Sequence, residues 1–326
     1  MSTFRLTEIL SGLACLFLTA TNAVADSSNH VSSSATAATG KWTAQSPLAS
    51  KQDTECVHFT DAKTGYAFGD KGTIFKTTDA GNTWKRLKSG TTSALWIAFF
   101  TDSNTAYAVG DDGTIIKTAN AGDTWGKLSS GTTNNLLSVY FTDAKTGYVS
   151  GNGGVILKTT DAGLTWKTLT SGTSQFLQSI YFTDAKRGYA VGAGGVIVKT
   201  TDAGETWTKL PSGTKGSFSF LTFTDANTGY AVGDPGVYKT TDAGETWKPT
   251  PLKPTGWSTL FFTDAKTGYL GGDGGLLYKT TDAGGSWTKL SGGSSLAVSS
   301  IFFTDANTGY AVGDNGGYWK YQATAH

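Results

Sequence analysis

A phrase of the form FTDAKTGYAVG…KTTDAGETW recurs along the chain at a nearly fixed interval, and this repeat limits the possible folds more than any other feature. The first aspartate of each unit serves as its marker, and the markers are Asp61, Asp102, Asp143, Asp184, Asp225, Asp264 and Asp305. The interval is 41 residues except between Asp225 and Asp264, where it is 39. A period of about 40 residues indicates a blade, solenoid or array architecture rather than one irregular core.

Each unit divides into four short strands separated by turns. In the unit of Asp143, the apolar segment 136–141 fits an inner strand that is buried on both faces. A second strand begins at 148–150, the glycine-rich segment 151–154 closes a hairpin, and segments 155–159 and 166–169 supply the third and fourth strands. Four antiparallel strands in about 40 residues are typical of a propeller blade. We therefore predict an all-β fold of seven four-stranded antiparallel blades.

The two ends of the chain predict how the ring closes. The last unit ends with its third strand at 318–321, so its fourth strand is missing. The segment Lys41-Trp42-Thr43 is similar to fourth strands of other units, such as Thr206-Trp207-Thr208. We predict that this N-terminal strand pairs with the C-terminal blade, because closure removes the exposed edges of an open stack. The propeller domain should then span 41–326.

The N-terminal region has the pattern of an export signal. Residues 1–25 contain Arg5 in a short polar start, an apolar stretch at 9–20 and small residues at 23–25. The apolar stretch is too short to span a bilayer stably. We expect an exported protein of the periplasm or the extracellular space, or of the thylakoid lumen if the organism is photosynthetic.

The segment that follows the signal is small and polar, and residues 26–40 are predicted to form a disordered linker. Removal of the signal also removes Cys15 and leaves Cys56 as the single cysteine, so no intramolecular disulfide is expected. A lipoprotein attached through Cys15 is the alternative to soluble export, although Gly12 stands where such signals have a Leu-like residue.

A second motif closes the third strand of most units, as in Thr200–Trp207 (TTDAGETW). It resembles the Asp-box, or bacterial neuraminidase repeat, with the pattern Ser/Thr-x-Asp-x-Gly-x-Thr/Ser-Trp. The longer phrase Gly-Tyr-Ala-Val-Gly…Lys-Thr-Thr-Asp-Ala-Gly is similar to the photosystem II assembly and stability factor family of seven-bladed propellers, over roughly 41–321. That resemblance implies a non-enzymatic role in assembling or stabilising a complex. The Asp-box alone is unspecific, since sialidases, xyloglucanases and sorting receptors also carry it.

The Asp-box side chains are predicted to be structural. A carboxylate at this position can accept backbone N–H groups across the turn, and the glycine two residues later supplies an unusual φ. In one unit Asn120 replaces the aspartate, which an amide can do as an acceptor but not as a general acid. The tryptophans are expected to pack between blades. The predicted structural residues are Asp79, Asn120, Asp161, Asp202, Asp242 and Asp282 with Trp84, Trp125, Trp166, Trp207, Trp247 and Trp287.

Two other charged positions recur. A lysine on the third strand of every unit is expected to lay its stem along the blade and reach a turn carboxylate. The turns between the second and third strands carry Asp70, Asp111, Asp234, Asp273 and Asp314, with Asn152 and Ala193 at the remaining two places. These carboxylates could form an acidic rim that attracts a basic partner or a cation, or could serve hairpin geometry alone.

Composition excludes several classes of function. The net charge of +1 argues against binding to nucleic acid or to a membrane surface. No His/Cys cluster has zinc spacing, and we expect no cofactor and no metal. Sialidases of the Asp-box class hold their substrate with three arginines, whereas the mature chain would keep only Arg86 and Arg187. His58 stands where other inner strands carry aromatic residues, which favours a core position over a general base.

An asymmetric partner requires positions at which the sevenfold pattern breaks. Phe176 is the outlier eight residues before the markers, and Trp96 is the outlier six residues before them. The loops 211–218 and 249–257 are the most individual, and they contribute aromatic and lysine side chains. We predict a monomeric, non-enzymatic propeller that binds a protein or peptide client. The candidate contacts are Trp96, Phe176, Lys215, Phe218, Lys253 and Trp257. A carbohydrate-binding or glycoside-hydrolase-like propeller is the alternative, because two carboxylates suffice for a glycosidase.

Overall fold

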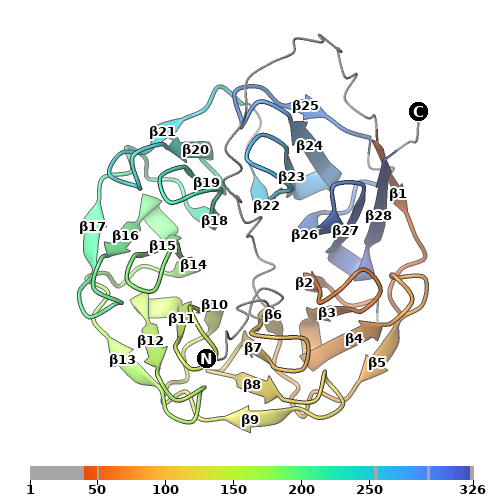
Figure 1. Cartoon of the computed structure of the whole chain (residues 1–326), viewed down its shortest axis with the longest axis horizontal. Coiled ribbons are helices and arrows are strands. Elements are labelled where there is room, and N and C mark those ends of the chain that lie inside the picture. The colour runs from red at the N-terminus through yellow and green to blue at the C-terminus, as the bar shows by residue number, and fades with distance from the viewer. Residues whose placement is uncertain (1–39, 50, 253–255, 292–293, 324–326) are drawn as a thin grey trace, which may run out of the picture.

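The computed structural model describes residues 40–49, 51–252, 256–291 and 294–323. Their strands form seven four-stranded antiparallel sheets arranged as blades around a central axis (Figure 1). This confirms the predicted all-β seven-bladed propeller. The predicted signal at 1–25, the linker as far as residue 39 and the candidate contact Lys253 lie outside the described residues.

Blades I to IV follow one another along the chain. Blade I consists of β2 (Thr54–Phe59), β3 (Gly65–Gly69), β4 (Thr73–Thr77) and β5 (Lys85–Leu87). Blade II consists of β6 (Leu95–Phe100), β7 (Ala106–Gly110), β8 (Ile115–Thr118) and β9 (Gly126–Leu128). Blade III consists of β10 (Leu136–Phe141), β11 (Gly147–Gly151), β12 (Ile156–Thr159) and β13 (Lys167–Leu169). Blade IV consists of β14 (Leu177–Phe182), β15 (Gly188–Gly192), β16 (Ile197–Thr200) and β17 (Thr208–Leu210).

Blades V to VII complete the ring. Blade V consists of β18 (Phe218–Phe223), β19 (Gly229–Gly233), β20 (Gly236–Thr240) and β21 (Lys248–Pro249). Blade VI consists of β22 (Trp257–Phe262), β23 (Gly268–Gly272), β24 (Leu276–Thr280) and β25 (Thr288–Lys289). Blade VII consists of β26 (Val298–Asp305), β27 (Thr308–Gly313), β28 (Tyr318–Ala323) and β1 (Gly40–Ala44). Five turns between second and third strands are short 3-10 helices, η1 (Asp70–Gly72), η2 (Asn152–Gly154), η3 (Ala193–Gly195), η4 (Asp273–Gly275) and η5 (Asp314–Gly316).

The N-terminal strand closes the ring, as predicted. β1 pairs antiparallel with β28 from Gly40↔Ala323 to Ala44↔Trp319, and the two strands lie side by side in Figure 1. Trp42 is 1% exposed and meets the ring of Phe303 edge-on at 5.8 Å between centroids. The closing strand therefore contributes a large buried aromatic side chain as well as backbone hydrogen bonds.

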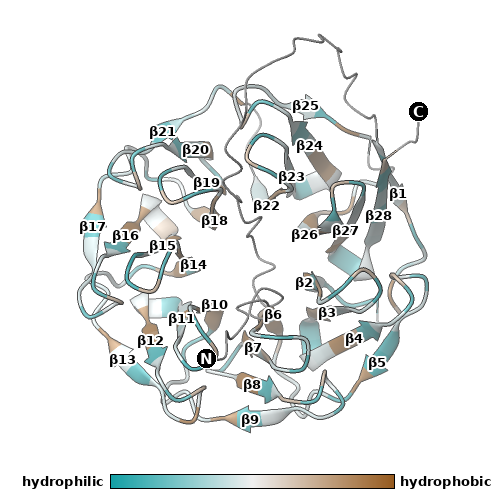
Figure 2. Ribbon diagram, viewed as in Figure 1, coloured by the Kyte–Doolittle hydropathy of each residue, from teal (hydrophilic) through white to brown (hydrophobic). Residues whose placement is uncertain are grey.

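The first strand of each blade lies nearest the axis. All six residues of β10 are buried, as expected for a strand packed on both faces. Figure 2 shows hydrophobic residues on inner strands such as β10 and β14, and hydrophilic residues on outer strands such as β5, β9 and β13. The core is thus a series of layers between blades rather than one central mass.

Aromatic pairs join neighbouring blades. Tyr107 in the second strand of blade II stacks on Phe141 in the first strand of blade III, with centroids 4.1 Å apart. Phe141 also meets Trp166 of its own blade edge-on at 6.2 Å. The same Tyr–Phe stack recurs between Tyr148 and Phe182 at 4.0 Å. Offset stacks and edge contacts of this kind add specific stabilisation to the buried area.

Each Asp-box is a turn stabilised by its own side chains. In blade III, Asp161 accepts the Thr165 backbone N–H at 2.9 Å and the Thr165 hydroxyl at 2.6 Å. The Thr159 hydroxyl donates to the same carboxylate at 2.8 Å and accepts the Gly163 N–H at 2.9 Å. These hydrogen bonds lower the pKa of Asp161 to about 2, the Thr165 hydroxyl contributing most. In blade II, Asn120 accepts the equivalent N–H of Thr124 at 3.0 Å.

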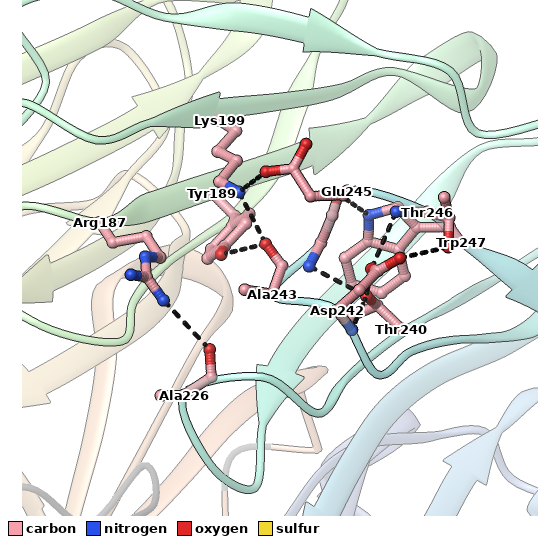
Figure 3. A network of polar contacts seen from close by, with 11 residues as sticks. Arg187, Tyr189, Lys199, Ala226, Thr240, Asp242, Ala243, Glu245, Thr246 and Trp247 are labelled. Atoms are coloured by element: carbon pink, nitrogen blue, oxygen red, sulfur yellow. Dashed lines mark hydrogen bonds and ion pairs between the residues drawn. The ribbon is translucent and has the colours of Figure 1, made fainter.

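At six of the seven junctions, the Asp-box also connects its blade to the preceding one. Ala162, at φ +60°, donates its N–H to Lys145 of its own blade at 2.9 Å. Its carbonyl oxygen accepts the Tyr107 hydroxyl at 2.8 Å and the Lys117 ammonium at 2.9 Å, both from blade II. We refer to such a Tyr–Lys–carbonyl contact as a latch. Figure 3 shows the latch of Tyr189 and Lys199 on Ala243.

The latches correct the prediction for the recurring lysines. Six of the seven lysines donate to a backbone carbonyl of the next blade, as Lys117 does. Each of the seven ammonium groups also lies over the tyrosine of its own blade, and that of Lys117 is 5.0 Å from the ring centroid of Tyr107. Carboxylates are an addition in some blades, as where Lys158 pairs with Glu205 at 2.8 Å. The register between blades, which the prediction lacked, determines this choice.

Candidate functional site

The two faces of the ring have different roles. One face, the Asp-box face, holds the marker turns and the Asp-boxes, whose polar groups are engaged in turns and latches. The opposite face, the mouth face, holds the turns between second and third strands and the loops that lead into each first strand. The central channel opens on the mouth face at the beginnings of the first strands. Sequence outliers among the blades concentrate at this opening.

A β-bulge occurs near the start of every first strand. In blade II the register passes from Leu95↔Gly110 to Ile97↔Val109, which leaves Trp96 unpaired between them. The same shift occurs in all seven blades. Bulges bend a strand and redirect a side chain, and they are common beside functional sites. The seven bulged residues are Glu55, Trp96, Leu137, Gln178, Ser219, Ser258 and Ser299.

A glycine at the end of each second strand makes this geometry possible. A Cβ on Gly192 would lie 1.8 Å from the carbonyl oxygen of Phe176, although the backbone of Gly192 is extended. That carbonyl instead accepts the N–H of Ala193 at 3.0 Å, which fixes the loop before the first strand to the neighbouring turn. The repeated Gly of the Tyr-Ala-Val-Gly phrase is therefore required by a close backbone approach.

The bulged side chains line a cavity at the opening of the channel. Its volume is about 230 Å³, and all seven of them border it. The residues that directly follow the bulges in the first strands complete the wall, among them Cys56, Phe220 and Thr259. We call this cavity the mouth. It is smaller than typical small-molecule pockets of roughly 300–1,000 Å³, so its size suits one inserted side chain.

Trp96 occupies a fixed position in the mouth. Its indole N–H donates to the carboxylate of Asp111 at 2.7 Å, and the ring is half-buried in the wall of the cavity. The indole donor is thus satisfied within the protein, while the ring borders the open space. Ser and Gln side chains, which stand at this position in other blades, could not supply such a platform, so Trp96 differs from its counterparts in chemistry as well as in size.

Acidic residues surround one part of the mouth. Five adjacent blades, V, VI, VII, I and II, place an aspartate first in the turn between second and third strands, and Asp53 adds a further carboxylate beside blade I. We call these residues, with Glu55, the acidic arc: Asp53, Glu55, Asp70, Asp111, Asp234, Asp273 and Asp314. The ion pairs formed by described residues, Lys76–Asp123, Lys158–Glu205 and Lys199–Glu245, all involve Asp-box turns and none involves the arc.

The electrostatic coupling shows that the arc is compact around blade I. Burial, followed by the charges of Asp70, Asp53 and Asp314, raises the pKa of Glu55 to about 7. Burial and the charges of Asp53 and Asp111 also raise the pKa of Asp70, against a smaller opposite effect of Lys71. Burial and the charge of Asp53 likewise raise the pKa of Asp314. A carboxyl group whose pKa is raised by neighbouring negative charges lacks sufficient cationic compensation.

The remaining part of the mouth, formed by blades III and IV, is neutral. Asn152 and Ala193 stand at the turn positions that carry aspartate in the other blades. Phe176 lies beside Ala193 and is 52% exposed, which makes it one of two strongly exposed large apolar side chains in the described part of the chain. The mouth is consequently divided into an acidic part and an apolar part, and the sevenfold symmetry is lost there.

The structure separates the predicted contact residues into two groups. Trp96 lines the mouth, Phe176 is exposed outside the cavity just before β14, and Lys215 is exposed on the loop that leads into β18. Phe218 and Trp257, by contrast, are each 1% exposed, and Phe218 packs edge-on against Tyr238. These two residues occupy the core position just before the bulge, so a partner could not reach them without opening the blade. The prediction that Phe218 and Trp257 contact a partner is therefore wrong.

Glu55 is the site residue that the sequence prediction overlooked. The sequence does contain an indication of its role, because Glu55 is charged whereas the other six residues at the bulge position are neutral. His58 lies deeper, at 4% exposure, stacked on Phe100 with centroids 4.5 Å apart. Burial lowers the pKa of His58 to about 3, so it is neutral and belongs to the core. Among the described residues no group of three or more His, Cys, Asp or Glu is placed to hold a metal ion.

A second concavity lies at the outer edge between blades I and II. It is an open groove bordered by Lys71, Arg86, Lys88 and Lys127. The groove is cationic, whereas the mouth is acidic, so the two would select partners of opposite charge.

The fold and the latched Asp-boxes define a closed Asp-box propeller. The family model described as "Photosynthesis system II assembly factor YCF48" matches residues 34–133, 86–160 and 117–256, which together cover more than half of the 326 residues. The chain therefore belongs to the YCF48 photosystem II assembly factor family. Comparison with curated proteins gives no sequence match. No helix of the described residues is long and apolar enough to cross a membrane.

Solved structures share the fold. YCF48 bound to D1 peptide is 18% identical, with a TM-score of 0.73 over 87% of this chain and 95% of that one. YCF48 from Cyanidioschyzon merolae is also 18% identical, with a TM-score of 0.73 over 86% and 99%. The GH74 xyloglucanase from Xanthomonas campestris is 14% identical, with a TM-score of 0.67 over 86% of this chain but 53% of that one. At these identities the likeness establishes the propeller fold alone.

Proposed function

We propose that this chain is an exported, non-enzymatic propeller that binds a segment of a client protein at the mouth and assists the assembly of an envelope or photosynthetic complex. The observation that carries the proposal is the loss of sevenfold symmetry at the bulge position, where Glu55 and Trp96 replace small or neutral residues. A ring that recognises an asymmetric partner must differ from blade to blade. The Asp-box aspartates are engaged in turns, six of the recurring lysines in latches, and tryptophans such as Trp166 in ring packing.

The family and one solved relative support a peptide client. The chain belongs to the YCF48 family, and a structure of YCF48 contains a D1 peptide. The described residues include two arginines, Arg86 and Arg187. Arg187 donates to the carbonyl of Ala226 in the next blade (Figure 3).

The carbohydrate alternative has less support. A glycosidase requires two carboxylates about 5–10 Å apart on either side of the scissile bond. Glu55 is the one carboxylate among the described residues that line the mouth, and the aspartates of the acidic arc stand outside it. The xyloglucanase likeness covers about half of that enzyme's length.

The test is an affinity capture from the organism's own envelope extract, with the full chain as bait and a glycan array in parallel. We expect one or a few proteins that are enriched by the wild type and lost with Trp96→Ser, while Lys88→Gln in the outer groove retains them. Glycan binding or xyloglucan cleavage without any protein that depends on Trp96 would replace this proposal with the carbohydrate function.

A further inference from the structure

The size of the mouth and the shape of its wall limit what it can hold. Seven bulges direct side chains into a cavity of about 230 Å³, and apolar groups from Leu137, Phe220 and Trp96 form much of its wall. This space accommodates a single long side chain better than a folded surface or a drug-sized ligand. An occupant must therefore project one side chain from an extended segment that crosses the mouth face.

The charge around the mouth identifies the sign of that side chain. The acidic arc places carboxylates from five adjacent blades around the opening, and the charges of Asp70, Asp53 and Asp314 disfavour the ionised form of Glu55 inside it. Among the described residues no lysine or arginine forms an ion pair with them. A cation that enters would relieve this repulsion, because a positive group favours the ionised carboxylates. Charge complementarity thus favours a cationic occupant.

Polar groups inside the cavity suit a donor with several N–H groups. Ser179 has its hydroxyl engaged, since it accepts the N–H of Leu221 in the next blade at 3.2 Å. Thr259 holds the equivalent position in blade VI, lines the same cavity and is 4% exposed. Because Thr259 borders the cavity, its hydroxyl could accept a hydrogen bond from an ammonium or guanidinium group that enters.

Two aromatic residues indicate which further contacts a bound segment would make. Trp96 presents its ring to the cavity while Asp111 holds its N–H, and a cation beside an indole ring gains cation–π attraction. On the opposite, neutral part, Phe176 is 52% exposed next to Ala193 and offers an apolar contact outside the cavity. A segment that crosses from the acidic to the neutral part meets these two environments in order.

We propose that the mouth binds an extended client segment by inserting one lysine or arginine side chain between Glu55 and Trp96, with a neighbouring apolar residue of the segment resting on Phe176. This inference rests on the proposed function and names the chemistry of its client. It assigns the acidic arc a binding role, which hairpin geometry alone would not require. The cationic outer groove is not part of this site.

The proposal predicts a pH dependence. Glu55 faces the carboxylates of Asp53, Asp70 and Asp314, the hydroxyl of Ser299 and, in the cavity wall, the thiol of Cys56. Since the pKa of Glu55 is raised to about 7, the residue is mostly protonated at pH 6 and mostly ionised at pH 8. The affinity for a cation should therefore rise about tenfold between these pH values, as one ionisation is required.

The test uses the full chain and a series of acetylated, amidated peptides that differ only at a central lysine, arginine, norleucine or glutamate next to a leucine. We expect the lysine and arginine peptides to bind at least ten times more tightly than the norleucine peptide at pH 8. Glu55→Gln should abolish both this preference and the pH dependence. Phe176→Ser should weaken all peptides that contain the leucine, and Lys88→Gln should change nothing.

Equal binding of the lysine and norleucine peptides, or an unchanged preference in Glu55→Gln, would overturn the inference. Glu55→Gln removes a buried charge and adds none, so a loss of binding cannot be attributed to unfolding if the thermal midpoint is maintained. Butylamine serves as the free-amine probe, and tight binding of butylamine alone would overturn the requirement for a peptide. A client captured through Trp96 without any lysine preference would reject the inference and keep the proposed function.

Discussion

The latch between blades II and III offers a quantitative test of how the ring is held together. The carbonyl oxygen of Ala162 accepts the Tyr107 hydroxyl at 2.8 Å and the Lys117 ammonium at 2.9 Å. Tyr107→Phe removes the hydroxyl and keeps the ring, and Lys117→Met removes the charge and keeps the stem. This latch has no added carboxylate, because Leu164 stands where the next blade has Glu205.

The expected energies follow from the two donors sharing one acceptor. Loss of the tyrosine hydroxyl should lower the free energy of unfolding by about 1 kcal/mol, since the carbonyl retains the lysine. Loss of the half-buried ammonium should cost about 1 kcal/mol for the same reason. The double variant leaves the carbonyl without a protein donor, so it should lose about 3 kcal/mol rather than about 2. The coupling energy of the pair is then about 1 kcal/mol.

Urea denaturation followed by tryptophan fluorescence measures all four proteins of this double-mutant cycle. Lys127→Met on β9 is the matched control, because Lys127 is exposed and its removal should change stability by less than about 0.5 kcal/mol. If the double variant lost no more than the sum of the single variants, the shared carbonyl would be satisfied by solvent and the latch would not act as a unit. If both single variants were neutral, the latch would contribute nothing to stability.

Three further predictions concern the core, the Asp-box and the mouth. His58 is neutral in the folded protein, with a pKa of about 3, and becomes protonated on unfolding, so the wild type should lose roughly 1.4 kcal/mol of unfolding free energy per pH unit as the pH falls below 6.5. His58→Phe should not show this loss. Unfolding curves of both proteins at pH 6.5 and 5 test this, and an equal change of unfolding free energy with pH in the two proteins would contradict it. Asp161→Asn should lower the thermal midpoint less than Asp161→Ala, since an amide still accepts the turn N–H; equal midpoints would show that the acceptor is unimportant. Gly192→Ala should cost roughly 3 kcal/mol, since its Cβ would meet the Phe176 carbonyl at 1.8 Å, whereas Gly126→Ala, with no atom within 4 Å, should be tolerated; similar calorimetric midpoints for the two variants would refute the close approach.

The sequence predicted the fold because a period encodes the blade directly. The segment 136–141 was predicted as an inner strand and is β10, and Trp42 was predicted in the strand that closes the ring, which is β1. Both features depend on local pattern and on counting strands. Neither requires knowledge of how one blade sits against the next.

The site was only partly predictable, because it depends on register. The seven bulges leave no mark in composition, so the sequence could rank Trp96 as unusual without showing that its side chain shares a cavity with Glu55. The loops with the most individual sequences led to a wrong prediction. Phe218 and Trp257 seemed distinctive there, yet they hold the position that Leu95 holds in blade II, and that position is buried. Loop individuality and side-chain exposure are thus separate properties.

The pairing of β1 with β28 has a consequence for the order in which the chain can become stable during synthesis. The residues of β1 leave the ribosome before any blade exists, and their partners at 319–323 appear only after blades I to VI. Blades I to VI can each form from continuous chain, whereas Trp42 has no complete packing site until β28 has been synthesised. A nascent chain, or one truncated before β28, should therefore expose this strand to chaperones and proteases, and the synthesis of β28 is the step that protects the whole ring.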